Sequence, residues 1–137
     1  MHPRFAKAPR AHATIAGERL DLVIAESQRL RFLGLMRLDA DEIEPLLFPR
    51  CRSIHMYWMR AAIDIVWLDL DRSAGRAEVL SVCAELVPGE RAGAPKVADR
   101  DARKRVAALE LPSGRAGALG LAEGSTFELR IEVGPSG

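Results

Sequence analysis

The sequence has few of the features that mark several functional classes. No apolar run approaches the roughly 18 residues of a membrane-spanning helix, and residues 1–17 lack the apolar segment of a secretory signal. Twenty basic and nineteen acidic residues leave a net charge of +1, which gives no overall field to attract nucleic acid or anionic lipid. These absences predict a cytoplasmic protein without a transmembrane segment that does not bind nucleic acid.

Cysteine and histidine are also scarce. Cys51 and Cys83 stand far apart, no CxxC pair occurs and the chain has three histidines, so the spacing supports neither a structural zinc site nor a cofactor. Two cysteines in a domain of this size are more often reduced and partly buried than paired. They could form a disulfide only if their strands were neighbours. We therefore expect free thiols and no metal or cofactor.

The length of 137 residues, with 48% hydrophobic and 28% charged residues, is typical of one soluble globular domain. Residues 1–10 carry prolines and charges without a period, which predicts a disordered N-terminal tail. Residues 11–134 are then expected to form a single domain. No internal repeat suggests a second one.

The central stretch, residues 51–71, contains both tryptophans and the only tyrosine, and we interpret it as paired core strands. Before it, Gly17-Glu18 separates two apolar segments and predicts a hairpin with a type II′ turn. Ser27 is a candidate N-cap for a short helix that reaches Met36. After it, residues 88–105 have the composition of a long loop, and residues 127–133 alternate as an amphipathic strand.

Many short strands with only two short helices, the second within residues 112–121, indicate a mostly β fold. The expected architecture is a single-domain antiparallel β-sandwich or a half-open barrel. A ferredoxin-like α+β layer is the alternative, but its helices would have to be longer than these.

A polar cluster within the central stretch is the candidate site. His55, Arg60 and Asp64 are ionisable residues in apolar surroundings, with Cys51 and Met59 close in sequence. A buried carboxylate at Asp64 must be paired or hydrogen-bonded. The cluster could therefore lock strands together, or the arginine and histidine could bind a carboxylate or phosphate of a small ligand.

Catalysis by this cluster is the less favoured interpretation. Cys51 and His55 form the only nearby nucleophile and base pair, but in an extended strand their Cα atoms would lie about 13 Å apart. A metal-assisted reaction would need further acids such as Asp69 or Asp71, and one histidine with scattered carboxylates is common by chance. We therefore assign no catalytic residue and no metal ligand.

The central motif resembles a known family. Cys-Arg-Ser-Ile-His at residues 51–55, followed by Met59-Arg60 and Ile63-Asp64, is similar to the domain of unknown function 192 family, in a branch with the pattern His-xxx-Met-Arg-xx-Ile-Asp. Residues 31–36, 108–112 and 120–124 extend the resemblance over about residues 20–133. It implies a compact, mostly β fold and no catalytic residues. The chain lacks the family's usual Phe-Gly pair near Tyr57 and its proline at Ala62.

These observations together predict a non-enzymatic module that binds a small anionic ligand or a protein partner through His55, Arg60 and Asp64. A hydrolytic or metal-assisted enzyme that uses the same residues is one alternative. The other is an accessory protein that acts through an exposed edge strand, with residues 127–133 as the pairing edge.

Overall fold

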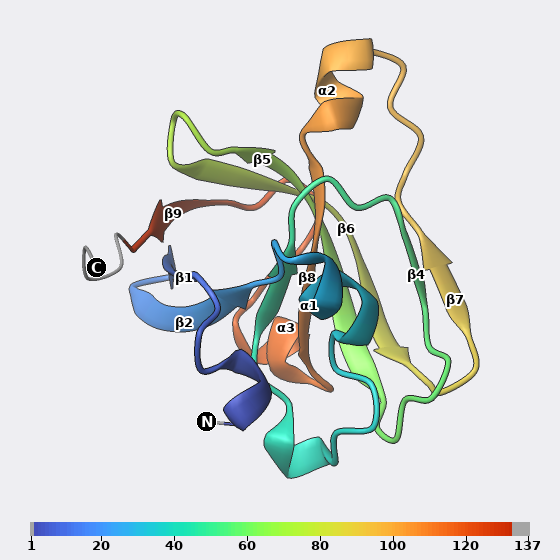
Figure 1. Ribbon diagram of the computed structural model, residues 1–137. Coiled ribbons are helices and arrows are strands. Elements are labelled where there is room, and N and C mark those ends of the chain that lie inside the picture. The colour runs from blue at the N-terminus through green and yellow to red at the C-terminus, as the bar shows by residue number, and fades with distance from the viewer. Residues whose placement is uncertain (1, 133–137) are drawn as a thin grey trace.

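The computed structural model describes residues 2–132 and shows a closed seven-stranded β-barrel (Figure 1). The strands follow each other around the barrel in the order β1-β2-β3-β8-β5-β6-β9, and β9 pairs back with β1. All neighbours are antiparallel except β2 and β3, which are parallel. The barrel strands are β1 (Arg10–Ile15), β2 (Glu18–Ile24), β3 (Leu46–Phe48), β5 (Ile63–Asp71), β6 (Arg76–Leu86), β8 (Val106–Pro112) and β9 (Thr126–Ile131).

Short elements decorate the barrel. A two-stranded antiparallel ribbon lies outside it, and three short α-helices and two 3-10 turns fill the connections. The ribbon consists of β4 (Ser53–His55) and β7 (Arg91–Gly93); the helices are α1 (Gln28–Leu33), α2 (Arg100–Lys104) and α3 (Arg115–Ala118); the 3-10 turns are Pro3–Phe5 and Ala40–Glu42. Within the described residues, no helix is both long enough and apolar enough to cross a membrane.

The barrel corrects the predicted sandwich, although the mostly β class is confirmed and the half-open barrel was the nearer alternative. Four residue pairs between β1 and β9, from Ala11↔Ile131 to Thr14↔Glu128, close the sheet on itself. The central stretch is also arranged differently from the prediction. Its two strands, β4 and β5, belong to separate sheets and do not pair with each other, because residues 56–62 leave the extended conformation between them.

Two apolar clusters explain why the sequences of β5 and β8 are nearly continuous hydrophobic runs. The barrel interior takes one set of side chains, which includes Val66, Leu68 and Leu109. The opposite set, including Ile65 and Trp67, packs outside the barrel against α1 and the segments around it. Strands that are buried on both faces lose the alternation expected of a half-exposed strand. In the outer cluster, α1 and the segments around it cover the outside of the barrel, and a cavity lies between them and β8.

Local turn chemistry was largely predictable. The β1–β2 hairpin forms, but its two-residue turn is Ala16-Gly17 with positive φ at both positions, which is the type I′ pattern instead of the predicted II′. Ser27 is the N-cap of α1, and its Oγ accepts a hydrogen bond from the Leu30 amide at 3.1 Å. Residues 88–105 contain β7 and α2 where a loop was expected.

The N-terminal segment packs onto the fold where the sequence predicts a disordered tail. Pro3–Phe5 forms a 3-10 turn and the Phe5 side chain is 0% exposed within the outer cluster. Arg4 donates hydrogen bonds to the carbonyl oxygens of Gly34 and Met36 at 2.9 and 2.8 Å. A single aromatic anchor and one arginine therefore position residues 2–10, which composition alone does not reveal.

Gly34, which ends α1, is a sensitive position because it has φ +45° and a Cβ there would lie 3.0 Å from Cζ of Phe48. We expect Gly34→Ala to reduce the free energy of unfolding by about 1–2 kcal/mol through backbone strain and crowding. Gly117→Ala is the matched control, since nothing lies within 4 Å of a Cβ in that α3 position and alanine favours helix. Urea denaturation of both variants measures the difference; equal losses would contradict the prediction.

Candidate functional site

The structure gathers three of the five predicted site residues around one cavity and places the other two elsewhere. Cys51, His55 and Met59 line a cavity of about 230 Å³ against β8. Its other walls come from residues 31–36, from Phe48 and from further residues between 51 and 59. Asp64 and Arg60 are not among the lining residues.

Asp64 is a structural carboxylate. It is 1% exposed, and its two oxygens accept hydrogen bonds from the backbone amides of Glu85 and Ala116, each at 3.0 Å. Glu85 has a positive φ of 54° beside the irregular register of β5 and β6. Ala116 is the second residue of α3, whose N-cap Gly114 has no side chain to satisfy the first amides of the helix. One side chain thus fixes both a strand irregularity and a helix start.

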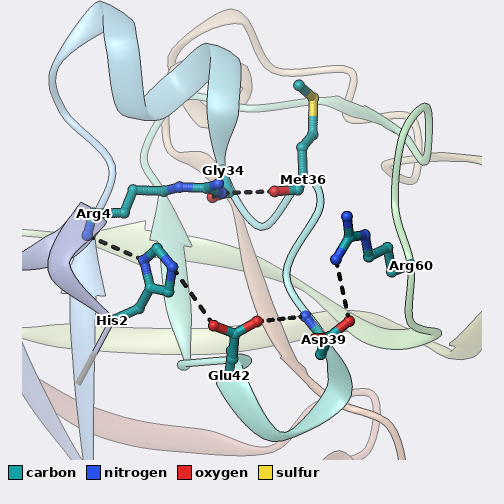
Figure 2. A network of polar contacts seen from close by, with 7 residues as sticks. All are labelled: His2, Arg4, Gly34, Met36, Asp39, Glu42 and Arg60. Atoms are coloured by element: carbon teal, nitrogen blue, oxygen red, sulfur yellow. Dashed lines mark hydrogen bonds and ion pairs between the residues drawn. The ribbon is translucent and has the colours of Figure 1, made fainter.

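Arg60 points away from this carboxylate. Its guanidinium is exposed and lies 3.4 Å from Oδ1 of Asp39, which belongs to a capping box with Glu42 at the 3-10 turn Ala40–Glu42 (Figure 2). Between residues 2 and 132 no hydrogen bond or ion pair joins His55, Arg60 and Asp64 to one another. The predicted polar network is therefore wrong, because residues 56–62 form an irregular connection between β4 and β5 that carries Arg60 away from Asp64.

His55 lies at the end of the outer ribbon. Its ring packs against that of Tyr57, with centroids 4.7 Å apart, and the Tyr57 hydroxyl accepts a hydrogen bond from Arg91 at 3.0 Å. His55 is exposed although it contributes to the cavity wall. It is a rim residue, not part of a buried polar network.

Glu110 is the functional candidate that sequence reasoning missed. It lies on β8, is 5% exposed, and lines the cavity. Burial raises the pKa of its carboxyl from 4.5 to about 8, so the group is mostly protonated at neutral pH. No residue between 2 and 132 forms a hydrogen bond with its side-chain carboxyl. The sequence signal was available, because Glu110 is the one charged residue in the apolar run Val106–Pro112.

Cys51 shares the cavity with Glu110. Its amide donates to the Val106 carbonyl at 2.9 Å, which holds it beside β8, and its thiol donates to the Ser53 carbonyl at 3.3 Å. Burial raises the pKa of this thiol, and Glu110 adds a smaller increase, while the hydrogen bond to the Ser53 backbone and the charge of Arg31 act in the opposite direction. The thiol is therefore protonated at neutral pH and is a weak nucleophile. Both cysteines are free, as expected.

Backbone carbonyls hold the cavity walls in place. Arg31 of α1 donates to the carbonyls of Pro49 and Arg50 at 2.6 and 3.2 Å, and the Arg37 amide donates to the Trp58 carbonyl at 2.9 Å. On the other side, Arg4 bonds the Gly34 and Met36 carbonyls (Figure 2). These contacts pin α1 and its following loop over β8.

Beside β8 the cavity therefore presents two neutral hydrogen-bonding groups, a carboxylic acid and a thiol, in walls that also include Arg31, Ser53, His55 and several apolar residues. Met36, Met56 and Met59 contribute to these walls, and their flexible thioethers adapt to the shape of a bound molecule. Within residues 2–132 no three His, Cys, Asp or Glu residues are grouped to hold a metal ion. The arrangement suits binding by hydrogen bonds and apolar contact.

The role of Asp64 can be measured by substitution. We expect Asp64→Ala to lower the free energy of unfolding by about 3–5 kcal/mol, because the buried Ala116 amide and the partly buried Glu85 amide lose their acceptor. Arg60→Ala serves as the control and should change it by less than about 1 kcal/mol, since its ion pair is exposed. Chemical denaturation of both variants provides the comparison. Similar losses in the two would mean that Arg60 and Asp64 act together after all.

The raised pKa of Glu110 predicts a pH dependence. The folded state keeps this proton to about pH 8, whereas the unfolded chain releases it near pH 4.5. The stability that neutral Glu110 contributes is complete below about pH 4.5 and is lost as the pH rises towards 8, by up to about 1.4 kcal/mol per pH unit.

Denaturation curves between about pH 5 and pH 8 test this, and Glu110→Gln should remove that part of the slope. Glu78→Gln, which changes an exposed carboxylate on β6, should leave the slope unchanged. A Glu110→Gln curve parallel to the wild type would show that Glu110 titrates normally.

Comparison with known proteins agrees with this architecture. A crystal structure of a protein of unknown function from Novosphingobium aromaticivorans DSM 12444 matches with a TM-score of 0.62 and 22% identity, over 95% of this chain and 97% of the other. A protein from Sinorhizobium meliloti 1021, described as a candidate transcription regulator, matches with a TM-score of 0.60 and 19% identity, over 90% and 92%. At these identities the likeness shows the fold alone.

The family comparison covers nearly the whole barrel. No curated protein matches the sequence. The family model of DUF192, described as uncharacterized ACR, matches residues 11–129. This match agrees with the resemblance carried by the central motif at residues 51–64. The chain belongs to the DUF192 family.

Proposed function

We propose that the protein is a non-enzymatic binding module whose cavity takes a small, uncharged and largely apolar molecule with one hydrogen-bonding group. The observation that carries this proposal is Glu110, a buried carboxyl that lines a cavity and has no hydrogen-bond partner among residues 2–132. A buried polar group without a partner costs free energy. A ligand that supplies the partner recovers that cost.

The charge of Glu110 selects the class of ligand. Its pKa of about 8 means that an anion bound against Glu110 would face a group that is either neutral or negative. The cation in the cavity wall, Arg31, already donates to the Pro49 and Arg50 carbonyls, so the anionic ligand expected from Arg60 is disfavoured here. A protonated carboxyl both donates and accepts a hydrogen bond. Primary amides, lactams and neutral carboxylic acids offer the matching pair of groups. The volume of about 230 Å³ is smaller than that of most drug-sized sites.

Features of the fold favour binding over the two alternatives. An enzyme would need an activated nucleophile, but burial raises the pKa of Cys51 and its thiol bonds a carbonyl, not a base. An accessory role through the last strand would need an open edge, and β9 is paired on both sides, with β1 and with β6. The cavity lined by Glu110 then remains the best supported place for a ligand.

Cys51 provides an internal reporter of cavity occupancy. We expect small primary amides and lactams to slow alkylation of the Cys51 thiol by iodoacetamide and to raise the melting temperature through binding to the folded state. Cys83 is the control thiol, because it is free and does not line the cavity. Ionised carboxylates of the same shape should have no effect.

A variant separates ligand binding from stability. Glu110→Leu removes the unpartnered polar group and should be at least as stable as the wild type near pH 8, yet it should lose the response to amides. If no compound in a broad panel of amides, lactams and neutral acids protects Cys51, or if Glu110→Leu responds as the wild type does, the proposal is wrong.

A further inference from the structure

A second hollow shares no lining residue with the cavity and is lined entirely by cationic side chains. It has a volume of about 430 Å³, and its lining residues are Arg50, Arg52, Arg100, Arg103 and Lys104. The whole chain has a net charge of only +1. This hollow therefore contains a quarter of the chain's twenty basic residues.

The positive charge of this hollow is not neutralised by the protein. Within residues 2–132, none of the five side chains takes part in an ion pair or a hydrogen bond. The neighbouring Arg105 shows the contrast, because its guanidinium pairs with Asp69 at 2.8 Å. The acids nearest in sequence are Asp99, which accepts hydrogen bonds as the N-cap of α2, and Asp101. Gathering unpaired like charges costs folding free energy.

Two separate segments face each other across the hollow. Arg100, Arg103 and Lys104 belong to α2 at spacings of three and four, which place side chains on one face of a helix. In Figure 1, α2 stands away from the barrel on the chain between β7 and β8. Arg50 and Arg52 come from the connection between β3 and β4, where Arg50 has a positive φ of 52°. A strained backbone at a non-glycine residue persists only where its surroundings enforce it.

An adjacent hollow provides space beyond the cations. It has a volume of about 560 Å³ and shares Arg50 and Lys104 with the first. Its further lining is mixed, with the cations Arg31, Arg72 and Arg105, the acids Glu26 and Asp71, and the uncharged Pro49, Leu70 and Ser73. A charged group held by the first hollow could therefore carry an organic group in the second. Arginine is suited to such recognition because its planar guanidinium binds phosphate oxygens in pairs.

We propose that this hollow is a binding site for a compact group of two or three linked phosphates, such as the phosphate chain of a nucleoside di- or triphosphate. Five cations from two segments around a concave space match a group whose charge is concentrated in a small volume. An extended nucleic-acid backbone would instead need cations along a stripe. The site is separate from the Glu110 cavity and its occupancy does not depend on the function proposed there.

Isothermal titration of the intact protein with inorganic tripolyphosphate tests the proposal. We expect one site, with affinity that falls as salt increases, and at least a tenfold loss in the Arg52→Gln/Arg103→Gln variant. Arg76→Gln/Arg130→Gln is the control, since it removes the same charge from exposed positions on β6 and β9. It should lower the affinity less than threefold. Circular dichroism confirms that both variants fold.

Further measurements separate the two proposals and define the outcomes that would overturn the phosphate site. Glu110→Leu should bind tripolyphosphate as the wild type does, so failure of this proposal and failure of the cavity proposal are distinguishable. Equal losses in the two double variants, or no binding of tripolyphosphate, would overturn the site. Binding of duplex DNA or RNA without binding of tripolyphosphate would also overturn it, in favour of an extended backbone-binding surface.

Discussion

The burial of β5 and β8 on both faces is the constraint on which the rest of the structure depends. Their inner side chains fill the barrel, but the outer ones, such as Ile65 and Trp67, would remain in water if nothing covered them. The segment after β2, the outer ribbon and Phe5 provide this cover. Because the cover consists of short pieces held by backbone carbonyls, it leaves a cavity between itself and β8.

Two buried carboxyls on neighbouring strands illustrate opposite outcomes of the same desolvation cost. Asp64 of β5 lies opposite Leu111 of β8, one register position from the pair Ile65↔Glu110. Two backbone amides donate hydrogen bonds to the Asp64 carboxylate. No group among the described residues donates to the Glu110 carboxyl, which is protonated instead. The first maintains the fold. The second leaves an unmet hydrogen-bonding capacity in the wall of the cavity, and the proposed binding function rests on it.

Local signals in the sequence proved reliable where one element determines the outcome. The hairpin, the Ser27 cap and the family motif required only neighbouring residues. The candidate site required knowledge of which faces meet, and residues 56–62, which join β4 to β5 outside any strand, separate the residues that were expected to meet. Glu110 was detectable as a lone charge in an apolar strand. The net charge of +1 predicted no attraction for anions, but it does not reveal that five unpaired cations lie at one hollow.

The pairing of β1 with β9 has a consequence for how the chain is made. Ala11 meets Ile131 in this ladder, so the contact that closes the barrel joins nearly the two ends of the described chain. Contacts between residues so distant in sequence form slowly, since loop closure must precede them. During synthesis the first hairpin has no partner for its outer edge until β9 leaves the ribosome. Barrel closure is therefore a late step of folding, and truncation before β9 would leave β1 and β6 with exposed edges.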